Sequence, residues 1–151
     1  MVGLNESYLE RIIYSLSMSE KILLKLATSL ITNPDTIIIE HQFSNLDRKN
    51  KLNIFNLLKE LKHKYDKTII IIEEDINILL EICNRLIIFK NNELIINDYV
   101  ENIFNNIELL LDNNIELPDL IKFSLIAKNY GKKIGYYNNV NDLIKEVYKK
   151  C

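Results

Sequence analysis

Two short runs of isoleucine constrain the fold more than any other feature of this chain. Residues 36–39 read Thr-Ile-Ile-Ile, residues 69–72 read Ile-Ile-Ile-Ile, and turn-forming or polar residues bound each run. Short apolar runs of this kind are typical of strands that are buried on both faces of a parallel sheet. Between them, residues 47–65 carry apolar side chains at helical spacing, at Leu52, Phe55, Leu58 and Leu61. The pattern therefore predicts a strand–helix–strand unit with a parallel sheet.

Helical patterns are expected on both sides of this unit. The two before it cover residues 6–13 and 19–31, and the one after it covers residues 75–83. The second of these ends at Asn33-Pro34-Asp35, a tripeptide that stops a helix and turns the chain. Helices and strands that alternate in this order predict an α/β layer structure.

The last third of the chain differs in character from the part before it. Strands are expected at residues 85–90 and 93–96, joined by an Asn91-Asn92 turn of the hairpin type. From Tyr99 onward the apolar residues recur only at helical spacing. We therefore predict an α/β domain over residues 1–98 and a helical accessory region over residues 99–151.

Composition excludes several classes of protein. A net charge of -2 and a pI near 5.7 give no general attraction to nucleic acid. The longest apolar runs are far shorter than the roughly 20 residues of a membrane-spanning helix, so a cytoplasmic location is expected. The two cysteines, Cys83 and Cys151, lie far apart and outside any metal-binding spacing. They predict neither a disulfide framework nor a zinc site.

The start of the helical pattern at residues 19–31 carries a capping motif. Ser17 and Glu20 have the Ser-x-x-Glu spacing in which each side chain accepts a hydrogen bond from a backbone N–H of the other residue. Such a motif is common and structural. A helix N-terminus is also an anion site, because its free N–H groups and the helix dipole favour negative charge. Both interpretations apply to this segment.

Residues 2–47, VGLNESYLERIIYSLSMSEKILLKLATSLITNPDTIIIEHQFSNLD, resemble the ATP-binding subunits of ABC transporters. The resemblance is to the energy-coupling-factor (ECF) type, which serves vitamin and metal-ion importers. The family has a short helix, an LSGGQ signature, a helix, Asn-Pro-Asp, a strand ending in Asp-Glu-Pro and a Gly-Leu-Asp turn. Residues 67–104 resemble its switch strand, hairpin and next helix, and the tail resembles its accessory region. The resemblance implies a partial P-loop NTPase fold, the C-terminal portion only.

The resemblance assigns roles to the signature residues. Ser17 would reach the γ-phosphate of a nucleotide that the opposite subunit holds, with Ser19 and Glu20 as the other signature residues toward that nucleotide. Glu20 stands in for the usual glutamine. Met18 and Ser19 replace the two glycines of the signature. Glycine lets a backbone amide approach a phosphate without a Cβ in the way, so Met18 is expected to weaken this contact.

The remaining site positions have also changed. Glu40 stands at the Walker B aspartate, where it would orient the shell of Mg²⁺ with a side chain one methylene longer. His41 stands at the catalytic glutamate, where it could orient water or simply end the strand with a polar side chain. Glu74 stands at the switch histidine, and with Glu73 and Asp75 it would repel a phosphate; the alternative is a solvated acidic loop. Asp47 matches the D-loop aspartate and is also a good helix N-cap.

No GxxxxGK(S/T) motif occurs in the sequence, which has three glycines in all. Phosphoryl transfer depends on that loop, so ATP and Mg²⁺ are expected only in a composite site with a partner. The first interpretation is a degenerate or truncated pseudo-subunit that docks on an intact ECF or ABC ATPase, at the cytoplasmic face of a membrane transporter. The alternatives are the C-terminal piece of a split ATPase, completed by a separate P-loop chain, and a gene fragment without function. A chromosome-maintenance ATPase is disfavoured, because the coiled-coil insertion and the basic surface are missing.

Overall fold

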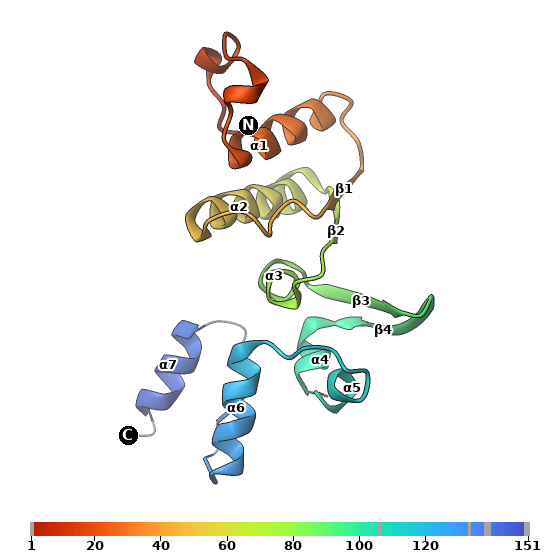
Figure 1. The fold of residues 1–151 in the computed structure, drawn as a ribbon, viewed down its shortest axis with the longest axis vertical. Coiled ribbons are helices and arrows are strands. Elements are labelled where there is room, and N and C mark those ends of the chain that lie inside the picture. Colours follow the sequence, from red (N-terminus) through yellow and green to blue (C-terminus); the bar gives the residue numbers. More distant parts are fainter. Residues whose placement is uncertain (1, 106, 133, 138–139, 150–151) are drawn as a thin grey trace. The chain divides into compact units, whose positions relative to one another are not determined.

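The computed structural model describes residues 2–105, 107–132, 134–137 and 140–149. Contacts divide the chain into two compact units, the first spanning Met1–Glu74 and the second Asp75–Cys151. Figure 1 shows the order of the helices and strands along the chain. The division falls between a strand and the helix that follows it.

The first unit contains the predicted strand–helix–strand arrangement. Its elements are α1 (Met18–Leu30), β1 (Thr36–Glu40), α2 (Arg48–Tyr65) and β2 (Thr68–Ile72). β1 pairs with β2 in parallel, with Thr36 opposite Thr68 and Glu40 opposite Ile72. The chain thus has the predicted α/β class with a parallel sheet.

α2 packs against this sheet with one buried face, and both ends of the helix are well defined. Its inner face buries Ile54, Phe55, Leu58 and Leu61. Phe55 packs edge-on against Phe43 of the preceding turn, with ring centroids 5.3 Å apart. Asp66, in the left-handed region, ends the helix, and the buried Lys67 then donates to Asn33 Oδ1 at 2.8 Å. Lys67 thereby joins the turns that precede β1 and β2.

The expectation that both strands are buried on both faces is wrong. Ile37 is buried, but the next residue, Ile38, is 62% exposed, and Ile70 and Ile72 of β2 are exposed as well. Successive side chains of a strand point to opposite faces. One face of this two-stranded sheet therefore has no covering element among the described residues.

The expected helix at residues 6–13 is also wrong. The structure has two single 3₁₀ turns there, Glu6–Tyr8 and Ile13–Ser15. Neither turn buries a residue, so the apolar side chains of the segment have no core face that would favour a continuous helix.

The second unit begins with a helix and a hairpin, and then is helical. Its elements are α3 (Ile76–Ile82), β3 (Arg85–Lys90), β4 (Glu93–Tyr99), α4 (Val100–Asn105), α5 (Glu108–Asp112), α6 (Asp119–Asn129) and α7 (Val140–Lys149). Asn91 and Asn92 both have positive φ, as the predicted hairpin turn requires. β4 runs three residues beyond the predicted end at residue 96 and stays paired with β3 up to Tyr99.

The hairpin and the helices after it share one hydrophobic core. That core takes buried residues from α3, both strands, α4, α5, α6 and the loop before α6: Ile76, Leu80, Leu86, Ile96, Val100, Ile103, Ile107, Leu110, Leu117 and Ile121. The predicted boundary between residues 98 and 99 falls at the end of β4, next to this core. The hairpin and the helical tail therefore pack as one unit.

Candidate functional site

The N-terminus of α1 is closed by the predicted capping box. The Glu20 backbone N–H donates to Ser17 Oγ at 3.3 Å, and the Ser17 backbone N–H donates to Glu20 Oε2 at 2.7 Å. Ser19 lies beside them, with its hydroxyl oxygen 3.2 Å from that of Ser17. The capping interpretation of this motif is confirmed.

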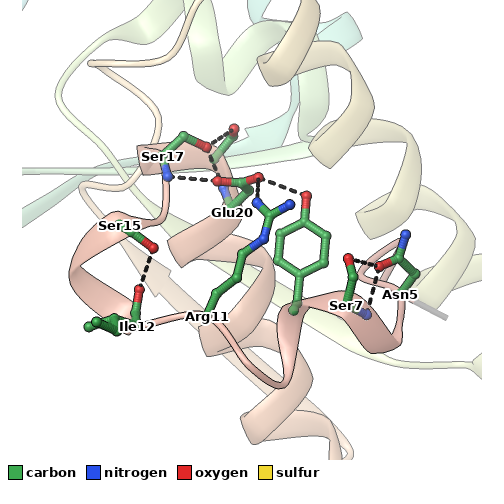
Figure 2. A network of polar contacts seen from close by, with 9 residues as sticks. Asn5, Ser7, Arg11, Ile12, Ser15, Ser17 and Glu20 are labelled. Atoms are coloured by element: carbon green, nitrogen blue, oxygen red, sulfur yellow. Dashed lines mark hydrogen bonds and ion pairs between the residues drawn. The ribbon is translucent and has the colours of Figure 1, made fainter.

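Two residues that the sequence did not single out complete this cluster. The Tyr8 hydroxyl donates to Glu20 Oε1 at 2.7 Å, and Arg11 Nη1 lies 3.7 Å from the same oxygen. Figure 2 shows Arg11 of the N-terminal segment reaching the Glu20 carboxylate. The hydrogen bonds from Tyr8 and then from Ser17 lower the pKa of Glu20 from 4.5 to about 2. Nothing in the local pattern marks Tyr8 or Arg11, since they lie twelve and nine residues before Glu20.

The carboxylate of Glu20 thus lies at the N-terminus of α1. It accepts the Ser17 N–H, and it is held there by Tyr8 and Arg11. Met18, the first residue of the helix, exposes half of its surface at the same end. A phosphate that approached this helix start would meet a negative charge and a methionine side chain.

The end of β1 places Glu40 and His41 differently. Glu40 is exposed, and its backbone carbonyl accepts a hydrogen bond from Gln42 Nε2 at 2.8 Å. His41 has a φ of +45°, and its backbone N–H donates to the Ile72 carbonyl at 3.0 Å. A positive φ is uncommon for a residue with a side chain, and it ends the strand here. The backbone hydrogen bond to Ile72 nevertheless continues the pairing of β1 with β2 by one residue.

Glu73 and Glu74, at the end of β2, lie in opposite environments. Glu74 is exposed, whereas the side chain of Glu73 is only 2% exposed. Glu73 Oε1 accepts hydrogen bonds from the Ser44 hydroxyl at 3.1 Å and from the Glu74 backbone N–H at 3.2 Å. His41 Nδ1 lies 3.5 Å from the same oxygen. Glu73 Oε2 is buried and has no hydrogen-bond partner among the described residues.

The sequence prediction treated residues 73–75 as one acidic group and so missed Glu73. The signal that could have found it is the period of two along a strand. Ile69 and Ile71 are the half-buried residues of β2, and Glu73 continues their face, while Glu74 continues the exposed face of Ile70 and Ile72. Asp75 belongs to the next element, because its side chain caps α3 by accepting from the Asn77 backbone N–H at 2.9 Å.

Asp47 acts as the N-cap of α2. Its side chain accepts a hydrogen bond from the Asn50 backbone N–H at 3.0 Å, and this bond is the main cause of a lowered pKa for Asp47. The predicted helix-capping role is confirmed, and the role of Asp47 at a subunit interface stays a prediction.

The described residues do not by themselves fit a Mg²⁺ or nucleotide site. No three His, Cys, Asp or Glu side chains within the described ranges come together as ligands for a metal ion. Among the described residues Glu40 therefore belongs to no such group of three ligands, and the helix start that would face a phosphate carries the Glu20 carboxylate. That ATP and Mg²⁺ bind only in a composite site with a partner stays a prediction.

No helix in the described part of the chain is both long and apolar enough to cross a membrane. No protein-family model matches the chain.

Individual relatives match it along most of its length. One is an energy-coupling factor transporter ATP-binding protein, EcfA, from Malacoplasma penetrans, which is 30% identical over 90% of this chain and 47% of its own length. Another, EcfA2 from Mycoplasmopsis synoviae, is 33% identical over 82% of this chain and 39% of its own length. An ABC transporter ATP-binding protein from Pyrococcus furiosus is 36% identical over 81% of this chain and 44% of its own length. The chain spans about half or less of the length of these curated relatives.

Solved structures give the same result for the fold. The protein cbiO1 from Clostridium perfringens, part of the ABC transporter complex cbiONQ, has a TM-score of 0.63 at 24% identity and is similar over 81% of this chain and 48% of its own. A dimeric ATP-binding cassette bound to ADP and phosphate has a TM-score of 0.57 at 26% identity, over 66% of this chain and 42% of its own. The fold is therefore a partial P-loop NTPase fold of the ABC ATPase type with a helical appendage. The chain is homologous to the ATP-binding subunits of energy-coupling-factor ABC transporters and corresponds to their C-terminal portion, with degenerate motifs.

Proposed function

We propose that the chain is a degenerate ATP-binding-cassette subunit of an ECF-type importer of a vitamin or metal ion. It acts as a pseudo-subunit, or interaction module, and does not hydrolyse ATP alone. The observation that carries this proposal is the Glu20 carboxylate, a negative charge that Tyr8, Arg11 and Ser17 hold at the start of α1.

The electrostatics of the strand ends support the same proposal. Glu40 is the last residue of β1, and Glu73 and Glu74 follow β2. No Lys or Arg side chain forms an ion pair with any of them in the described part of the chain. A triphosphate is stabilised by cations and N–H donors, whereas carboxylates repel it. These residues give the transferring phosphate no stabilisation of their own.

The proposed partner is an intact ECF or ABC ATPase subunit, through which the chain would associate with the transmembrane component at the cytoplasmic face of the membrane. The contacts would involve Asp47 and the helical tail. Exposed apolar side chains recur at helical spacing along α6, at Phe123 and Ile126, and continue at Tyr130, which caps that helix. They recur likewise along α7, at Val140, Ile144 and Tyr148. Exposed apolar stripes of this kind are typical of interaction surfaces.

Catalysis is tested with the purified chain, by ATP titration and by release of phosphate in the presence of Mg²⁺. We expect neither saturable binding nor turnover. A saturable, Mg²⁺-dependent turnover would contradict the proposal.

Association is tested by pull-down with the product of a neighbouring ATPase gene. Ile126→Asp should abolish capture, because it places a charge in the apolar stripe of α6. Lys128→Asp, two residues along the same helix, is the matched control and should preserve capture, because Lys128 lies outside that stripe. Equal capture of both variants would exclude α6 from the interface.

The alternative, a split ATPase completed by a separate P-loop chain, is favoured by one observation. The parallel sheet has two strands, and Ile38, Ile70 and Ile72 lie exposed on it. A parallel sheet is normally covered on both faces. Co-expression with a P-loop half should then restore Mg²⁺-dependent turnover and protect the backbone amides of β2 from hydrogen exchange; a gain of neither would exclude this alternative.

A further inference from the structure

His41 and Glu73 are the next residues in the register of the parallel sheet. β1 and β2 pair up to Glu40 and Ile72, so the residues one step further face each other across the strands. The His41 backbone N–H donates to the Ile72 carbonyl at 3.0 Å, which extends the ladder beyond the last paired residues. The backbone thereby holds the imidazole within reach of Glu73, although the φ of His41 is +45°.

The surroundings of Glu73 leave it one ionisable partner in the described part of the chain. Its side chain is 2% exposed, and His41 Nδ1 lies 3.5 Å from its Oε1. The two hydrogen bonds to Oε1 come from neutral donors, the Ser44 hydroxyl and the Glu74 backbone N–H. Oε2 is buried without a hydrogen-bond partner. Because a buried polar atom without a partner is costly, a carboxylate in these surroundings favours a hydrogen bond from any further donor within reach.

The imidazole has two different sides. Its Nδ1 faces the buried carboxylate, whereas 48% of the His41 side chain is exposed to solvent. In a neutral imidazole one nitrogen carries the proton and the other accepts, and the hydrogen bond made by one nitrogen decides the role of the other.

We propose that Glu73 is a positioning residue for His41. Its carboxylate accepts a hydrogen bond from Nδ1–H, orients the ring, and leaves Nε2 of the neutral imidazole as an acceptor available to water. His41 is then an oriented hydrogen-bond acceptor at the end of β1 and not simply a polar residue that ends a strand. The assignment concerns this chain alone and does not depend on whether the proposed pseudo-subunit function is correct.

The tautomer of His41 tests this proposal directly. Long-range ¹H–¹⁵N correlation spectra of the ¹⁵N-labelled chain, recorded where both histidines are neutral, separate the two ring nitrogens of each residue. The chain contains a built-in reference, because its other histidine is the exposed His63 of α2. We expect His41 as the Nδ1–H tautomer and His63 mainly as the Nε2–H tautomer that unrestrained imidazoles favour. Finding His41 mainly as Nε2–H would overturn the proposal.

Paired variants then identify the group responsible. Glu73→Leu removes the acceptor in a side chain of similar size, and the His41 spectrum should shift to the tautomer mixture of His63. Glu74→Leu makes the same change one residue along, and Ser44→Ala removes a competing donor to Oε1; both should leave His41 as Nδ1–H. An unchanged tautomer in folded Glu73→Leu would overturn the assignment. If that variant does not fold, the wild-type tautomer still decides.

Discussion

Glu20 and Glu73 occupy comparable places, each at the end of a regular element, and each accepts hydrogen bonds from a hydroxyl and a backbone N–H. Both oxygens of Glu20 have partners, which are Tyr8 and Arg11 for one and Ser17 for the other. Glu73 places all its contacts on one oxygen and leaves the other buried without a partner. A carboxylate with partners on both oxygens fixes local structure. A buried carboxylate with an oxygen that lacks a partner costs stability and stays available to a further hydrogen-bond donor.

Replacing Phe43 should produce the largest effect, because it removes the packing that supports the second of these regions. Phe43 is fully buried, packs on Phe55, and lies in the turn between His41 and Ser44. We expect Phe43→Ala to lower the free energy of unfolding by about 3–5 kcal/mol in denaturant titrations. The matched control is Phe89→Ala, an exposed position, which should stay within about 0.5 kcal/mol of the wild type. Equal losses from both variants would show that Phe43 is not a core residue.

Removing the cap of α1 should have a smaller effect. Ser17→Ala deletes the acceptor for the Glu20 backbone N–H, so we expect the free energy of unfolding to fall by about 1 kcal/mol. The control on the same helix is Ser29→Ala, whose hydroxyl donates to the Lys25 carbonyl and caps nothing. That variant should be neutral within about 0.5 kcal/mol. If Ser29→Ala lost as much as Ser17→Ala, the capping box would not be the cause.

Glu73 should respond in the opposite sense to Glu20. We expect Glu73→Leu to keep or raise the free energy of unfolding, by up to about 1 kcal/mol, because it removes a buried oxygen without a partner. Glu20→Leu should lower that free energy, because it leaves the Ser17 N–H and the Tyr8 hydroxyl without their acceptor. The same denaturant titrations measure both. If both variants changed the free energy of unfolding in the same direction, Glu20 and Glu73 would not differ in their effect on stability.

Sequence reasoning recovered what depends on near neighbours. The Ser17–Glu20 capping box, the Asp47 cap and the Asn91-Asn92 turn each involve residues within three positions of one another, and each is present in the structure. The two strands followed from their short apolar runs, and the helix between them followed from the helical spacing of its apolar residues.

Contacts between distant segments were not predicted. Tyr8 meets Glu20 across twelve positions and Glu73 meets Ser44 across twenty-nine, and no local pattern encodes either contact. The exposed face of the sheet was missed for a related reason. A run of isoleucines indicates that a strand is apolar, but it does not indicate whether another helix or strand covers it.

The smallest expected effect on stability comes from the Tyr8 hydroxyl, and it is read most clearly from the titration of Glu20. The pKa of Glu20 is about 2 in the folded chain, below its usual value of 4.5, first because Tyr8 donates to it. A group with a lowered folded pKa stabilises the fold above its unfolded pKa and loses that contribution as the pH falls through the folded value. The contribution of Glu20 is therefore full above about pH 4.5 and disappears towards pH 2.

Tyr8→Phe should raise the pKa of Glu20 from about 2 towards 4.5, as followed by the carboxyl carbon shift in an NMR titration. Tyr14→Phe makes the same change at an exposed tyrosine of the same segment and should leave that pKa unchanged. In Tyr8→Phe the Ser17 N–H still donates to Glu20, so the pKa should remain below 4.5. A return all the way to 4.5 would mean that Tyr8 also holds the Ser17 cap in place, and an unmoved pKa would mean that Ser17 alone sets it.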